Sequence, residues 1–199
     1  MKRLILLMFV LSAALQTAGA QPVELDVRAG LDISTITCGA GRMSAVAGVS
    51  AGVNAGYEIW NGIYARTGLG IVSRGGMDER LYSRYSLVCL EIPLTVEYDF
   101  PVGSRSALFA ECGVWGSCGI GGRIRTEGGT YGAYGSGASN FAEPFDAGLL
   151  GGAGVVIDGR VRVGVRYEYG LCNIANEGVR DVLGNCYSNG LCIQIGWMF

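Results

Sequence analysis

One stretch decides the fold of this chain: residues 161–171, which read VRVGVRYEYGL. Its odd positions carry Val, Tyr or Leu, and its even positions carry Arg, Glu or Gly. An alternation with a period of two residues is typical of a β-strand, because successive side chains of a strand point to opposite faces. The stretch therefore predicts a strand with one apolar face and one polar face.

Seven other segments alternate in the same way, and they lie at residues 23–32, 48–59, 63–71, 90–98, 108–120, 145–157 and 191–199. Short connections near 60–62, 99–105 and 158–160 separate some of them, and Asn61-Gly62 is a strong hairpin signal. Longer connections fall near 33–43, 73–84, 121–142 and 172–187. This organisation predicts an all-β fold, an eight-stranded antiparallel up-and-down barrel whose turns are tight at one end and long at the other.

The first 20 residues have the organisation of a secretory signal. Lys2 and Arg3 precede an apolar run from Leu4 to Leu11, and small residues follow up to Ala20. We expect cleavage after Ala20, so that residues 1–20 are a signal peptide and residues 21–199 form one domain. The longest apolar stretch after Ala20, residues 149–157, is too short for a membrane-spanning helix.

Composition excludes one class of partner. The chain has 15 Lys and Arg and 17 Asp and Glu, and removing Lys2 and Arg3 with the signal leaves a net charge of −4 and no lysine. A nucleic-acid-binding protein would carry a basic stripe to neutralise phosphates, whereas the arginines here are scattered. We expect no nucleic-acid partner.

The distribution of aromatic residues favours a barrel that faces lipid. The apolar faces end in aromatics, as in the interfacial girdles of outer-membrane barrels, and the glycine-rich polar faces suit a narrow lumen. The predicted periplasmic girdle comprises Tyr57, Trp60, Tyr98, Phe100, Trp197 and Phe199, and Phe145, Tyr169 and Tyr187 fall at the predicted outer ends. We therefore expect a transmembrane β-barrel in the outer membrane of a Gram-negative cell, with both termini in the periplasm. A secreted soluble β-barrel that binds a ligand is the alternative.

Several short motifs carry a family resemblance: Leu90–Leu94, Phe145–Gly148 leading to Gly152–Gly154, Val165–Leu171 and the aromatic carboxyl terminus Trp197–Phe199. With these motifs the chain resembles the small outer membrane protein beta-barrel domain, or porin-family, proteins, which are similar to the OmpX and OmpA barrels. The resemblance implies the barrel fold and the membrane, and no single activity. It also implies that Glu91 and Arg166 line the lumen.

The polar faces gather ionisable side chains inside the predicted barrel. Eight acids face four arginines, and an eight-stranded barrel is only wide enough for side chains to fill it. The predicted lumen network comprises Glu24, Asp26, Arg28, Glu58, Arg66, Glu91, Glu97, Glu111, Asp146, Arg162, Arg166 and Glu168. We expect these groups to pair with one another and to block conductance, because buried charges are usually paired.

The residues of this chain offer little support for a catalytic, metal or cofactor site. The chain has no histidine, which removes Ser-His-Asp and Cys-His catalysis and the usual zinc sites. Glu91, Glu97, Glu111 and Asp146 would have to work as acid and base, yet the same alternation places them beside arginines. We expect no catalytic residue, no metal ligand and no cofactor.

Seven cysteines in an exported chain indicate disulfide bonds, and the odd number leaves at least one thiol unpaired. Cys172 and Cys186 flank the last long loop and are the best candidate pair. Cys112 and Cys118 are too far apart along one strand to bond, and Cys38 is expected to be a loop thiol.

These observations predict a non-enzymatic barrel protein of the outer membrane, with a structural or surface-interaction role through its outer loops. A small passive channel is the alternative. The outer loop 126–140, which contains Tyr131 and Tyr134, is a candidate ligand-contacting surface. The expected partners are outer-membrane lipid and, through the carboxyl-terminal strand, the barrel-assembly machinery, and we expect a monomer.

Overall fold

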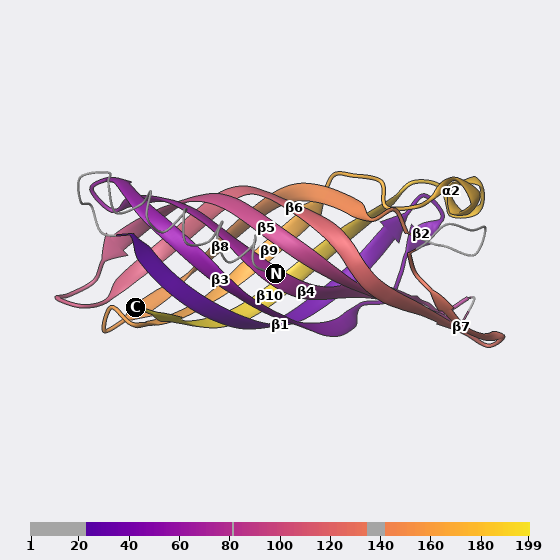
Figure 1. The fold of residues 1–199 in the computed structure, drawn as a ribbon, viewed down its shortest axis with the longest axis horizontal. Coiled ribbons are helices and arrows are strands. Elements are labelled where there is room, and N and C mark those ends of the chain that lie inside the picture. The colour runs from indigo at the N-terminus through magenta and orange to yellow at the C-terminus, as the bar shows by residue number, and fades with distance from the viewer. Residues whose placement is uncertain (1–22, 81, 135–141) are drawn as a thin grey trace, which may run out of the picture.

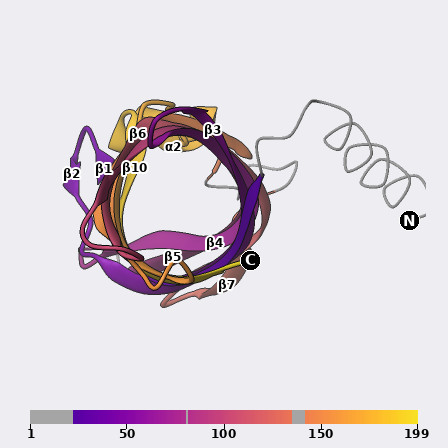
Figure 2. The same ribbon diagram turned by 90° about the vertical axis from the view of Figure 1, so that its left-hand side faces the viewer.

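The computed structural model describes residues 23–80, 82–134 and 142–199, and in this part of the chain one antiparallel sheet closes into a barrel (Figure 1). Figure 2 shows the ring of strands from the end that carries the short turns. The strands follow one another in chain order, and β10 pairs with β1 to close the ring. The barrel strands are β1 (Glu24–Cys38), β3 (Val46–Trp60), β4 (Ile63–Asp78), β5 (Ser83–Pro101), β6 (Ala107–Thr126), β8 (Phe145–Ile157), β9 (Val161–Gly170) and β10 (Cys186–Met198).

This arrangement confirms the predicted eight-stranded antiparallel barrel. Closure gives each of the eight barrel strands a neighbour on both sides. A structure in hydrocarbon requires this because no water is present to satisfy backbone groups. The predicted signal peptide, residues 1–20, lies outside the described residues and stays a prediction. Among the described residues, no helix is long and apolar enough to span a bilayer.

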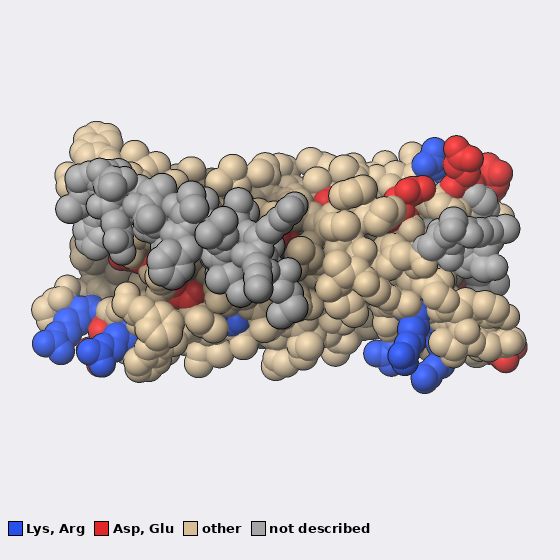
Figure 3. Space-filling view, in the orientation of Figure 1, with Lys and Arg blue, Asp and Glu red and all other residues tan. Residues whose placement is uncertain are grey.

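The two faces of the sheet are inverted relative to a soluble barrel. Along β1, Leu31 exposes 67% of its surface, whereas its neighbour Asp32 exposes 7%. The same contrast holds on β9, where Tyr167 is 50% exposed and Arg166 is 8% exposed. Apolar side chains therefore cover the outside, and charged side chains fill the inside. On the face seen in Figure 3, most of the described surface over the middle of the barrel carries no charged residue.

The short turns and the carboxyl terminus share one end of the barrel (Figure 1). Asn61 and Gly62 both have positive φ, 34° and 82°, as a type I′ hairpin requires. At the same end, the Met198 N–H donates to the Arg160 carbonyl at 2.7 Å, in the β8–β9 turn. Since β1 also begins here, both ends of the barrel domain lie on the side of the tight turns.

The other end differs from the sequence-based prediction, because several predicted loops are continued strand. Strands β4 and β5 extend to Asp78 and Ser83, within the predicted loop 73–84, and β6 extends to Thr126, within 121–142. Strand β1 likewise reaches Cys38, within 33–43. The backbone pairing continues where the outward side chains become polar, so the apolar alternation stops before the strand does.

Three short elements decorate this outer end. Strand β2 (Gly41–Arg42) pairs with β1, and β7 (Gly129–Gly132) pairs with β6. Helix α2 (Glu177–Leu183) lies within the predicted loop 172–187, and its N-cap residue Asn176 accepts a hydrogen bond from the Val179 N–H at 3.2 Å. These elements make the outer end bulkier than the turn end.

Candidate functional site

The deepest layer of the lumen is built around Glu97 of β5, whose side chain is fully buried. Both of its oxygens accept hydrogen bonds from Arg162 of β9, one of them at 2.9 Å, and Arg66 of β4 donates to it at 2.8 Å. The Arg162 guanidinium also stacks 3.5 Å from the centroid of the Phe109 ring. Three strands are therefore tied together across the barrel at this level.

Glycine makes room for the Phe109 ring. A Cβ atom placed on Gly164 would lie 2.7 Å from the ring and 3.1 Å from the Ala153 carbonyl, closer than side chains pack. The polar faces are rich in glycine at such positions because a narrow barrel cannot hold a large side chain at every inward site.

The same layer continues toward β1. Arg66 also donates to Glu24 at 2.5 Å and lies 3.4 Å from Asp26, and Arg28 donates to Asp26 at 2.6 Å. Asn54 of β3 donates to Asp26 at 3.0 Å. The turn-end half of the lumen thus holds a continuous network of charge-assisted hydrogen bonds, which are stronger than neutral ones.

A further pair extends this network upward. Arg166 of β9 donates to both oxygens of Glu111 of β6, at 3.0 and 3.3 Å. Arg28 lies 3.9 Å from the same carboxylate. Glu111 therefore depends mainly on Arg166 for its neutralisation.

A second network lies nearer the outer end, around Arg74. This guanidinium donates to both Glu91 and Glu168, and it stacks 4.0 Å from the centroid of the Trp115 ring. Arg74 is absent from the predicted lumen network because residues 73–84 were expected to form a loop. A signal was available, since Arg66 and Arg74 are separated by an even number of residues and would lie on the same face of a continuous strand.

Two predicted members stand apart from the ion pairs. Glu58 accepts a hydrogen bond from the Gly62 N–H at 2.9 Å in the turn, and Asp146 accepts one from the Ala147 N–H at 2.8 Å. The structure shows no salt bridge for either carboxylate among the described residues. The remaining predicted lumen residues, Glu24, Asp26, Arg28, Arg66, Glu91, Glu97, Glu111, Arg162, Arg166 and Glu168, are brought together in ion pairs.

A cavity of about 50 Å³ separates the two networks. Its lining includes Arg28 and Arg166 of the first network, Glu91 and Glu168 of the second, and the buried Asp32. This volume is enough for a few water molecules, because one water needs roughly 10–15 Å³ on this measure. It is a pocket within a packed lumen.

The outer mouth is closed by an apolar cluster that the sequence analysis missed, here called the cap. Side chains from the extended strands pack with the last loop inside the barrel end, and α2 contributes Val179 and Leu183 at the margin. The buried members are Ile36, Cys38, Met43, Tyr85, Leu87, Cys89, Ile124, Ala133, Ala142, Ile174, Ala175 and Cys186. Polar networks therefore fill the lower lumen, and an apolar plug fills the top.

Tyr134 belongs to this cap. Its hydroxyl lies 3.5 Å from the Cys89 sulfur, and burial raises the pKa of the Tyr134 hydroxyl above its ordinary value. Of the two tyrosines in the predicted ligand-contacting loop, only Tyr131 is exposed. Residues 135–140 of that loop lie outside the described residues.

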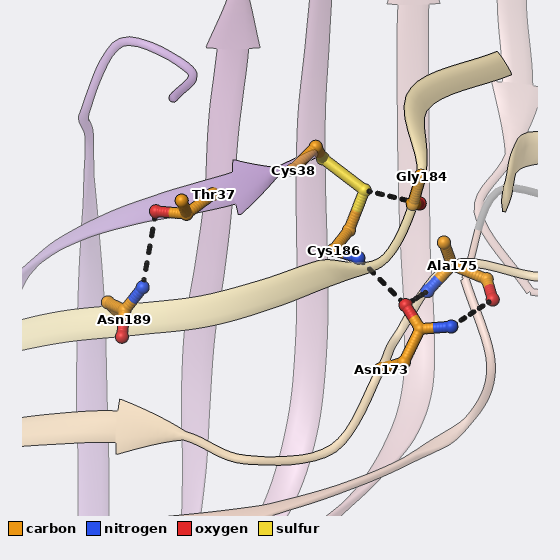
Figure 4. The surroundings of a disulfide bond; sticks show 7 residues. All are labelled: Thr37, Cys38, Asn173, Ala175, Gly184, Cys186 and Asn189. Atoms are coloured by element: carbon orange, nitrogen blue, oxygen red, sulfur yellow. Dashed lines mark hydrogen bonds between the residues drawn. A yellow bond between two sulfur atoms is a disulfide. The ribbon is translucent and has the colours of Figure 1, made fainter. Parts of the chain in front are cut away.

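The predicted disulfide between Cys172 and Cys186 is wrong. Cys186 bonds to Cys38 instead (Figure 4), and Cys172 is an exposed free thiol. Cys38 and Cys186 are direct partners in the register between β1 and β10, with their Cα atoms 4.0 Å apart. The prediction failed because it placed Cys38 in a loop, whereas β1 continues to that residue. The expectation that Cys112 and Cys118 do not bond each other is confirmed.

The site around the disulfide is held by one asparagine. Asn173 accepts hydrogen bonds from the backbone N–H groups of Cys186, at 2.8 Å, and Ala175, at 3.2 Å (Figure 4). Asn173, which follows Cys172 in the chain, thus anchors the last loop against β10 by hydrogen bonds.

The six predicted periplasmic girdle residues all lie near the turn end and are exposed on the outside. They are Tyr57, Trp60, Tyr98, Phe100, Trp197 and Phe199, with exposed fractions between 40% and 80%. The rings of Tyr98 and Phe100 meet edge to face at 4.3 Å. Nearer the outer end, Phe145 and Tyr169 are exposed, and Tyr187 is half-buried.

Comparison with known proteins agrees with this geometry. Residues 16–176 match the family model described as outer membrane protein beta-barrel domain. No curated protein sequence matches the chain significantly.

Solved structures share the fold at low sequence identity. The crystal structure of Neisserial surface protein A is similar with a TM-score of 0.55 and 16% identity, covering 90% of this chain and 100% of that chain. The outer membrane protein OprG from Pseudomonas aeruginosa gives a TM-score of 0.48 and 13% identity, covering 91% and 98%. Ail, the attachment invasion locus protein of Yersinia pestis, in complex with a heparin analogue, gives 0.48 and 12%, covering 90% and 100%.

The family model spans most of the chain, and the barrel presents an apolar outside and a charged inside. The chain therefore belongs to the outer membrane protein beta-barrel domain family and is a protein of the cell outer membrane.

Proposed function

We propose that this protein is a non-conducting, non-enzymatic barrel that anchors an interaction surface in the outer membrane. The observation that carries the proposal is the sealed lumen. The layer of Glu97 and Arg162, the layer of Arg74 and the apolar cap are each buried inside a barrel that is only wide enough for side chains, and together we expect them to seal it.

The outer end supplies the surface. Strands β4, β5 and β6 rise beyond the predicted apolar segments, and α2, β2 and β7 add to the same end. Large apolar side chains are exposed there: Tyr82 at 66%, Tyr131 at 46% and Val182 at 75%. Exposed aromatic and aliphatic residues on projecting elements are typical of contact surfaces for other molecules.

Catalysis has no support in the lumen. The chain contains no histidine, and three of the four carboxylates that might act as acid and base, Glu91, Glu97 and Glu111, are held by arginines. The fourth, Asp146, accepts a hydrogen bond from the Ala147 N–H.

Conductance tests the sealed lumen. We expect the folded protein to give negligible single-channel current in planar bilayers in which a known porin, as the control, conducts. Steady unitary currents through the wild type would replace this proposal with the passive channel.

Cell binding tests the surface. Cells that display the wild type are compared, on arrays of glycans and proteins, with cells that display Tyr82→Ser, Tyr131→Ser and Val182→Ser combined. We expect at least one array signal to be lost in the variant at equal surface expression. Identical array profiles for the wild type and the variant would show that these side chains do not contribute to surface binding.

A further inference from the structure

Three arginines stand on the outer wall of the barrel, near its outer end. Arg84 of β5 lies directly opposite Arg125 of β6, and Arg123 lies opposite Ser86. All three arginines are exposed, whereas Tyr85 and Ile124 between them are buried in the cap. Figure 3 shows basic side chains gathered over this region, beside β7.

A β-bulge turns these arginines outward. The register between β5 and β6 shifts at Val88 and Cys89, where Ile120 is the extra residue. Below the bulge, odd-numbered residues of β6 such as Trp115 point into the lumen. One inserted residue exchanges the two faces, so the odd-numbered Arg123 and Arg125 point to the outside.

These arginines lack the partners that every lumenal arginine has. Arg28, Arg66, Arg74, Arg162 and Arg166 all form salt bridges with acids, but within residues 23–80, 82–134 and 142–199 no salt bridge involves the outer-wall three. Two like charges directly opposite across a strand pair destabilise the sheet. Repulsion between Arg84 and Arg125 therefore lowers the stability of the sheet, and an external anion bound to the pair would remove this repulsion.

Their height matches the outer headgroup region of a bilayer. Between Leu108 and Ile120 the outward face of β6 is mostly apolar, and this stretch covers roughly 30 Å along the barrel axis at about 3.3 Å per residue and a strand tilt of about 40°. That is the thickness of a hydrocarbon core, about 30 Å. Arg123 and Arg125 follow immediately beyond it.

The surroundings suit an amphiphilic ligand. A hollow of about 650 Å³ is lined by Arg84, Arg123 and Arg125, by the hydroxyl residues Ser86 and Thr130, and by the apolar Val88 and Ile120. The arginines and hydroxyls offer donors to an oxyanion, and guanidinium groups bind phosphate through two parallel hydrogen bonds. The apolar residues lie on the membrane side, where acyl chains would run.

We propose that this outer-wall patch, Arg84, Arg123 and Arg125 with Ser86 and Thr130, binds the phosphate groups of a phosphorylated lipid headgroup in the outer leaflet. The patch faces sideways into the lipid and not upward from the loop tips. It is independent of the sealed lumen and of the surface role proposed above.

The test compares thermal unfolding in two kinds of vesicle, phosphatidylcholine alone and phosphatidylcholine mixed with diphosphorylated lipid A. In the mixed vesicles we expect the double variant R84Q/R125Q to melt below the wild type by about 3 °C, the size of shift that one lost interaction gives a chain of this length. In phosphatidylcholine alone we expect the variant to melt at the same temperature as the wild type or above it, because a repulsive pair has been removed.

R105Q/R160Q is the matched control, since it removes the same charge from exposed arginines of the turn end. Its difference from the wild type must be the same in both vesicles. Lipid A without phosphates must abolish the stabilisation of the wild type, and high salt must reduce it. If R84Q/R125Q does not fold, R123Q and the salt dependence of the wild type give the same comparison.

The proposal is overturned if R84Q/R125Q and R105Q/R160Q respond alike to lipid A. It is also overturned if soluble heparin, added to the wild type in phosphatidylcholine alone, reproduces the whole stabilisation. That result would assign the patch to a soluble polyanion.

Discussion

The lumenal arginines differ in how many acids each one holds. Arg66 contacts Glu24, Asp26 and Glu97, whereas Arg166 is the main partner of one acid, Glu111. Removing an arginine is costly when it leaves a buried carboxylate without compensation, and less costly when a second arginine remains close. The stability lost when a lumenal arginine is replaced therefore depends on whether its carboxylate partner keeps another arginine nearby.

Replacement of Arg166 by Ala is expected to lower the free energy of unfolding by about 3–5 kcal/mol, the typical cost of breaking a buried pair. Glu111, whose side chain is fully buried, would retain only Arg28 at 3.9 Å. Urea unfolding in lipid vesicles measures the change. Arg160→Ala, at an exposed turn position, is the control and is expected to change little; equal stability of both variants would contradict the network.

At the scale of elements, period two was enough to predict each barrel strand within the lipid-facing band. It failed above that band for two physical reasons. Outward residues such as Arg84 become polar there, and the bulge at Ile120 exchanges inside and outside on β6. The loss of outward apolar residues hid the extensions of β1 and β4, and with them the positions of Cys38 and Arg74. The bulge hid the extension of β6.

The ion-pair partners were beyond the reach of the sequence as well. Alternation places Glu97 and Arg162 inside the barrel, but which arginine meets which acid depends on the stagger between strands that are not neighbours in the sheet. The cap was missed because most of its residues come from predicted loops, and Tyr85, Leu87 and Cys89 fall between a predicted loop and the next predicted strand. The two-residue period of a strand shows which of its side chains point inward, but it does not show which side chains of other strands they contact.

The disulfide is expected to stabilise the junction of β1 and β10. It spans a sequence separation of 148 residues, for which the chain-entropy model gives about 5 kcal/mol. Non-reducing peptide mapping should recover Cys38 joined to Cys186, and Cys38→Ser should lower the melting temperature. Cys172→Ser should leave the melting temperature unchanged, and recovery of Cys172 in a disulfide peptide would contradict the structure.

At the scale of the whole molecule, the barrel combines three zones along its axis: a girdle of aromatics at the turn end, two ionic networks in the lumen, and an apolar cap at the outer end. The last strand contributes to the girdle through Trp197 and Phe199, and the Phe199 N–H donates to the Leu25 carbonyl at 2.9 Å. This strand therefore closes the barrel, and we propose that its aromatic end also anchors the barrel in the membrane interface.

Replacement of Trp197 and Phe199 by Ser is expected to reduce the amount of folded barrel in the outer membrane. Folded wild type should migrate differently on a gel before and after boiling, because a closed barrel resists detergent until it is heated. The variant should show less of the unboiled form at equal synthesis. Phe145→Ser, which removes an exposed aromatic from the other end, serves as the control; the same yield in all three proteins would exclude a special role for the terminal strand.

The pairing of β1 with β10 also determines when the barrel can close. These strands are the first and last of the barrel in the chain, yet they are direct neighbours in space. No part of the chain can seal the ring before the last residues have crossed the inner membrane, since an incomplete sheet keeps two open edges. The chain must therefore reach the outer membrane before its barrel has closed. The pairing of β1 with β10 is the step that completes the fold.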